Sequence, residues 1–177
     1  DRASTKLKSY LLQGGYFSDN TMVKLVTWIV TERTYHAWNY ASKYEQSLYG
    51  RRYNSCGEYY DDKGDVHYYQ DQTDNYHQMN YQAIWSQLYG QNWSSNVTLH
   101  YSYGYGYYNE YKANKDYREY GLSDTKLKSD LTRKKIMEND LYGIVASINY
   151  DNKANYKATL GGGWNKYVGD HFGKVLW

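Results

Sequence analysis

The sequence predicts an all-β protein, specifically a segment of an antiparallel up-and-down transmembrane β-barrel with about seven to eight long strands. Three observations predict it: apolar and polar side chains alternate along long segments, aromatic residues gather near the segment ends, and short connections alternate with long ones. Of the 177 residues, 19% are Phe, Trp or Tyr and 26 are tyrosine, yet the mean hydropathy is −0.98. Rings with a polar tip favour a boundary between water and an apolar phase.

Seven strands are expected in order, at residues 5–17, 21–35, 75–89, 93–108, 141–150, 155–168 and from 173 onward. Tight turns are expected at 18–20, 90–92 and 151–153, where Asp, Asn, Ser and Gly gather. Long polar segments cover 36–74 and 109–140. Within them the sequence predicts a hairpin over 58–69, turning at 61–65, and a short exposed helix in 124–138.

The strand over 93–108 shows the alternation most clearly. Val97, Leu99 and Tyr101 alternate with polar Asn96, Thr98 and His100, and the strands at 75–89 and 141–150 behave in the same way. Strands of this length exceed those of ordinary globular sheets. Short and long connections alternate along the chain, so the short ones should lie at one end of the sheet and the long ones at the other. This arrangement is typical of outer-membrane barrels, which have short periplasmic turns and long extracellular loops.

We therefore expect one face of the sheet to contact lipid and the other to line a lumen. The residues expected to face lipid are Trp85, Trp93, Leu99, Tyr101, Ile144 and Ile148. A transmembrane helix is not expected, because the longest apolar run, 22–30, is interrupted by Lys24 and Thr27.

Composition limits the remaining possibilities. The chain is expected to be a single barrel segment over 1–177, without a plug domain, and is interpreted as a mature form, an excised piece or an engineered chain. A net charge of +2 argues against a nucleic-acid partner. Cys56 is the one cysteine, so an internal disulfide is excluded, and its thiol either pairs outside the chain or stays buried and inert.

No catalytic residue, metal site or cofactor is expected, and the chain is not expected to be an enzyme. The histidines lack the spacing of a zinc site, residues 61–65 lack the ligand pattern of a calcium loop, and the loop carboxylates lie in solvated stretches. Ligand contacts are expected from loop residues that could stack on a ring or hold an anion: Arg51, Arg52, Tyr59, Tyr60, Tyr68 and Tyr69.

Several phrases, in order along the chain, resemble TonB-dependent outer-membrane receptors. They include Tyr10-Leu11-Leu12-Gln13-Gly14-Gly15-Tyr16, Arg52-Tyr53-Asn54-Ser55-Cys56-Gly57, Gly104-Tyr105-Gly106-Tyr107-Tyr108, and Gly169-Asp170-His171-Phe172-Gly173-Lys174-Val175. The resemblance implies a 22-stranded barrel with a plug, located in the bacterial outer membrane, that captures a siderophore, haem, cobalamin or glycan. It implies as partners the outer-membrane lipid, the remaining strands and plug of the receptor, and the TonB complex through the missing part; the small-molecule ligand is not identified.

Two alternatives remain open. The chain could be a soluble, tyrosine-rich β module that binds carbohydrate on its aromatic face. It could also be an engineered small barrel without a native ligand, which the absence of proline favours.

Overall fold

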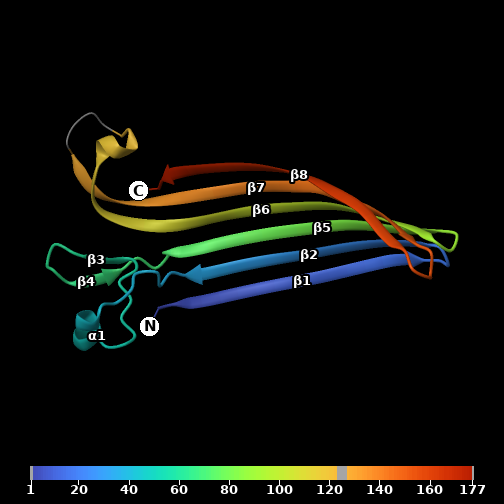
Figure 1. Cartoon of the computed structure of the whole chain (residues 1–177). Coiled ribbons are helices and arrows are strands. Elements are labelled where there is room, and N and C mark those ends of the chain that lie inside the picture. Colours follow the sequence, from blue (N-terminus) through green and yellow to red (C-terminus); the bar gives the residue numbers. More distant parts are fainter. Residues whose placement is uncertain (1, 123–126, 177) are drawn as a thin grey trace.

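Six long strands form one open, curved antiparallel sheet in the computed structural model, which describes residues 2–122 and 127–176 (Figure 1). The spatial order is β1-β2-β5-β6-β7-β8. The strands of this sheet are β1 (Ser4–Phe17), β2 (Thr21–Tyr35), β5 (Thr73–Tyr89), β6 (Trp93–Asp116), β7 (Lys128–Asp151) and β8 (Lys157–Val175). The loop between β2 and β5 carries α1 (Lys43–Tyr49) and a small hairpin of β3 (Glu58–Tyr60) and β4 (Val66–Tyr68), while η1 (Tyr117–Tyr120) follows β6.

The short turns lie at one end of the sheet, and the long loops lie at the other together with both chain ends (Figure 1). The turn after β1 closes through a bond that the Ser18 amide donates to the Thr21 carbonyl over 2.8 Å. In the turn after β7, the Asn152 carboxamide oxygen accepts the amide of Tyr156 over 3.0 Å. Asn and Asp side chains often stabilise turns in this way. The predicted turns at 18–20 and 90–92 are confirmed, whereas the third connection is longer than predicted and covers 152–156.

Strand register gives the sheet two chemically different faces. Residues directly opposite each other on antiparallel strands project to the same side. One row of opposite partners contains Leu25, Ala83, Leu99, Ile144 and Trp164, while the neighbouring row contains Val26, Gln82, His100, Gly143 and Asn165. We call the side that carries Leu99 the apolar face and the side that carries Thr98 the polar face.

All six residues predicted to face lipid lie on the apolar face. Their exposed fractions range from 38% to 51%, so they are open to the surroundings rather than covered by a second layer. Aliphatic and aromatic side chains thus form an extended exposed surface over all six strands.

The predicted helix in 124–138 is wrong over the residues that the structure describes, since residues 128–138 belong to β7; residues 124–126 lie outside the described part. Strands β6 and β7 each extend over 24 residues and form a hairpin well beyond the boundaries that the sequence predicted. An ion pair between Arg133 and Glu110, 2.7 Å apart, and a bond from Tyr111 to Asp130 cross this hairpin. The helix is expected because Leu127 and Leu131 lie one helical turn apart in the sequence, and these cross-strand partners outweigh that spacing.

The predicted seventh strand is also wrong. The sequence predicts a turn at 169–171 before that strand, but these residues continue β8, where Gly169 lies opposite Asn139 and His171 lies opposite Met137. A partner strand supplies the hydrogen bonds of this backbone, so local turn preferences of Gly and Asp do not decide its path.

The all-β antiparallel architecture is confirmed, but the sheet is not closed. Strands β1 and β8 form its two edges, and every residue of β1 is exposed. Among the described residues, no helix is long and apolar enough to cross a membrane.

Candidate functional site

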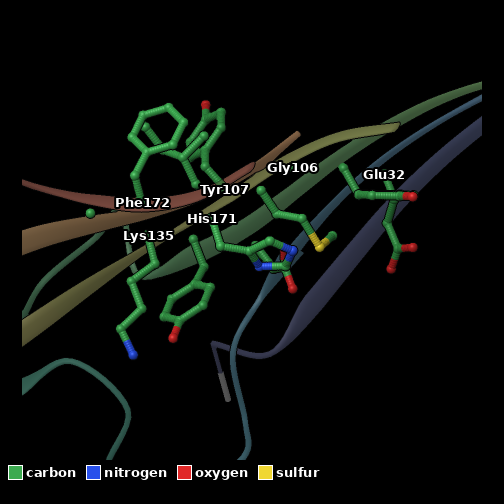
Figure 2. Close-up of a pocket in the computed structure, with 12 residues that line it drawn as sticks. Glu32, Gly106, Tyr107, Lys135, His171 and Phe172 are labelled. Atoms are coloured by element: carbon green, nitrogen blue, oxygen red, sulfur yellow. The ribbon is translucent and has the colours of Figure 1, made fainter. Parts of the chain in front are cut away.

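The polar face carries a hollow of about 730 Å³ near the loop end of the sheet. Strands β2, β5, β6, β7 and β8 contribute to it, and the side chains that matter for binding are Glu32, Asp74, Tyr76, Tyr108, Lys135 and His171. Figure 2 shows Lys135 and His171 on one side of the ribbons and Tyr107 and Phe172 on the other. We call this feature the polar-face hollow.

The ring of Tyr76 forms the floor of the polar-face hollow. It lies across two glycines of the neighbouring strand, because a Cβ atom added at Gly104 would stand 2.7 Å from the Tyr76 hydroxyl oxygen. One added at Gly106 would stand 2.7 Å from Cδ2 of the same ring. Glycine at both positions therefore lets the ring lie flat against the sheet.

Carboxylates lie on one side of this floor, and an ammonium and an imidazole lie on the other. Glu32 and Asp74 belong to β2 and β5, and Lys135 and His171 belong to β7 and β8. Thr34 donates a 2.8 Å hydrogen bond to the Glu32 carboxylate. The carboxylates can accept hydrogen bonds and the Lys135 ammonium can donate them, so the hollow suits a small ligand that has both donors and acceptors.

His36 ties the long loop to the rim of the polar-face hollow. Its ring stacks on Trp38 with 3.5 Å between centroids and meets the edge of Tyr108 at 6.0 Å. Only 5% of His36 is exposed, and its Nε2 atom has no hydrogen-bond partner among the described residues. This burial lowers the pKa of His36, although the nearby carboxylates of Asp74 and Glu110 act in the opposite direction.

The six loop residues predicted to contact a ligand do not line the polar-face hollow. Three of the tyrosines have partners within the chain, two through their rings and one through its backbone carbonyl. Tyr59 contacts the ring of Tyr111 with 5.2 Å between centroids, and the guanidinium of Arg2 lies 3.4 Å from the ring centroid of Tyr68. The carbonyl of Tyr69 accepts a 3.0 Å bond from the Tyr35 hydroxyl.

The other three predicted contacts lie on the outer surface of the loop. Tyr60 is 59% exposed and donates a hydrogen bond to Glu58, which raises the pKa of the Tyr60 phenol. Arg51 and Arg52 are exposed and form no ion pair with the described residues. Any ligand contact of Tyr60, Arg51 and Arg52 would therefore lie outside the polar-face hollow.

The loop itself folds partly as the sequence predicts. The hairpin of β3 and β4 is confirmed, and at its turn an Asp61 carboxylate oxygen accepts the amides of Lys63 and Asp65, each over 2.9 Å. Cys56 is free and fully buried. Its burial comes from the loop and from Arg2, which bonds to the carbonyls of Asn54 and Cys56.

Sequence reasoning missed the polar-face hollow because its residues are far apart in the chain. The signal available was the spacing of Gly104 and Gly106 opposite Tyr76, which becomes visible only once the register of β5 and β6 is fixed. The alternation of apolar and polar residues along each strand predicts a common polar face, but it does not predict a hollow on that face.

Comparisons of the chain with protein-family models, curated proteins and solved structures find no match. The roles assigned to its residues therefore depend on the geometry described above.

Replacing Gly106 by Ala should destabilise the sheet by about 1–3 kcal/mol, the usual cost of forcing extra volume into a packed site. The new methyl group would collide with the Tyr76 ring and stand 3.3 Å from the Asn75 carbonyl. The control is Gly162→Ala, because a Cβ there meets nothing within 4 Å. Urea unfolding of both variants in detergent micelles measures the difference, and equal losses would contradict the flat placement of Tyr76.

Docking of the long loop should weaken in mild acid. The folded-state pKa of His36 is depressed by burial, so its contribution is fully present above the unfolded-state pKa of about 6.5 and is lost as the pH falls through the folded-state value. Limited proteolysis of residues 36–72 should be faster at about pH 5 than at about pH 7.5. The variant His36→Phe should lose most of this difference, whereas His67→Gln should keep it; a wild-type rate independent of pH would refute the role of His36.

Proposed function

We propose that this chain is part of an outer-membrane β-barrel that captures a scarce small-molecule ligand and passes it across the membrane, and that it is not an enzyme. The observation that carries the proposal is the division of one sheet into an exposed apolar face and a polar face. In this proposal the apolar face contacts lipid, the polar face lines the passage, and the polar-face hollow holds the ligand near the long loops.

The order of side chains along the apolar face supports a membrane location. The aliphatic row of Leu25, Leu99 and Ile144 lies between two rows of rings. One of them contains Tyr81, Tyr101 and Tyr142, and the other contains Tyr89, Trp93 and Tyr150. Aromatic girdles flanking an apolar band mark the two interfaces of a lipid bilayer. In water, an exposed apolar surface of this extent would favour aggregation.

The two open edges support an incomplete barrel. The strands alternate in direction across the sheet, so β1 and β8 run antiparallel to each other. Outer-membrane barrels contain at least about eight strands, and lipid does not tolerate unpaired strand edges. We therefore propose that further strands of the same receptor pair with both edges, and that its plug and the TonB complex drive transport.

A test of the two faces is a pair of lysine substitutions on neighbouring residues of β6. Leu99→Lys places a charge in the apolar band and should cost about 2–4 kcal/mol of stability in a bilayer. Thr98→Lys projects from the polar face and should cost much less. Unfolding in lipid vesicles measures both, and equal losses would overturn the assignment of the faces.

The dependence of the chain on detergent tests the membrane location itself. The chain should stay dispersed in detergent micelles, and without detergent it should aggregate. A compact band in gel electrophoresis that shifts after boiling would mean that the six strands close on themselves as a small barrel, and would contradict the incomplete barrel proposed here. A chain that is monomeric without detergent and binds glycans through Tyr81 and Tyr101 would instead support a soluble carbohydrate-binding module. The rings of these two tyrosines are stacked with 6.2 Å between centroids.

A further inference from the structure

Cations gather on the apolar face near the loop end of β1 and β2. Lys6 lies opposite Arg33, and Lys8 projects to the same side of β1. Lys6 and Lys8 are exposed and form no ion pair with the described residues. Arg33 is 3.1 Å from Asp71, with both side chains more than half exposed.

The balance of charge differs between the two halves of this face. On β1, β2 and β5 no carboxylate projects from the apolar face, since Glu32 and Asp74 lie on the polar face. On β7 and β8 the apolar face carries both signs, with Glu138, Asp140 and Asp170 but also Lys134, Lys166 and Lys174. The β1–β2 side instead carries cations with no carboxylate on the same face of these strands, and we call it the basic corner (Lys6, Lys8 and Arg33).

An apolar groove lies on the same face, further from the loops. Its volume is about 610 Å³, and Leu12, Gly14, Leu25, Ala83 and Leu99 line it. Gly14 leaves the groove open, because a Cβ there would meet nothing within 4 Å. Leu12 and Lys8 are four residues apart on one strand, which corresponds to about 13 Å.

We propose that the basic corner and the apolar groove together bind one acylated lipid phosphate of the surrounding membrane. Lys6 and Lys8 hold the phosphate, and an acyl chain runs along β1 into the groove. Charge and shape support this assignment, because basic residues attract anionic lipid headgroups next to an apolar face and an open apolar groove accommodates an acyl chain. This proposal rests on the membrane location proposed above.

The alternative role of these lysines is protection of an edge strand, since exposed lysines hinder unwanted strand pairing. That role requires no preference for a phosphate. Selectivity for the phosphate therefore separates the two roles.

The test uses the full chain refolded in neutral detergent and titrated with lipid A, a diphosphorylated and acylated disaccharide, while tryptophan fluorescence reports binding. The double variant Lys6→Gln/Lys8→Gln should bind about thirtyfold more weakly at low salt, as expected for two lysines near an anionic lipid. The loss should shrink at high salt. The control Lys43→Gln/Lys63→Gln removes two exposed loop charges and should bind as the wild type does; equal weakening of the two double variants would overturn the proposal.

Two further comparisons separate headgroup from chain. Dephosphorylated lipid A should bind weakly, and inorganic phosphate alone should not bind measurably. Gly14→Leu fills the groove and should weaken binding, whereas Gly162→Leu on the other edge strand should not. Wild-type binding that is equal for the phosphorylated and dephosphorylated lipid would overturn this proposal and leave the membrane location intact, while a chain that enters no detergent or lipid would overturn both.

Discussion

Strand register is the constraint on which the other features of this molecule depend. Because Leu99 lies opposite both Ala83 and Ile144, aliphatic side chains from three strands reach the same side. Side chains alternate along a strand, so a slip of one residue would move the whole set to the other face. Such a slip would mix polar side chains into the apolar band and move Tyr76 away from Gly104 and Gly106. It would also place the cations of the basic corner on different faces of the sheet.

The same register joins the apolar face to the polar-face hollow. Strand β5 carries Tyr81 on the apolar face and Tyr76 on the polar face, so one strand serves both the aromatic girdle and the floor of the polar-face hollow. The loop that follows β2 is fastened to this sheet by His36 and by Arg2, which bonds to loop carbonyls. In the proposed function, ligand capture at the polar-face hollow and order in the loop would therefore be coupled through the rim that His36 forms with Tyr108.

Local patterns in the sequence predict most of the sheet but little of the site. Alternation and turn residues predict the strands, two of the tight turns, the β3–β4 hairpin and the face on which Leu99 and Trp93 lie. They fail where contacts between residues distant in sequence determine the secondary structure, as in the β6–β7 hairpin, which the ion pair of Glu110 and Arg133 crosses. They also fail in the loop, where Tyr59 and Tyr68 pack against residues distant in sequence that no local pattern identifies.

The central claim is that alternate residues of β6 face lipid and water, and accessibility of spin labels tests it most directly. Single cysteines at positions 96 to 101, in a Cys56→Ser background, would carry nitroxide labels in the chain inserted into lipid vesicles. We expect apolar oxygen to reach labels at Val97, Leu99 and Tyr101, and a polar nickel reagent to reach those at Asn96, Thr98 and His100. Uniform access of the polar reagent to all six positions would contradict the account.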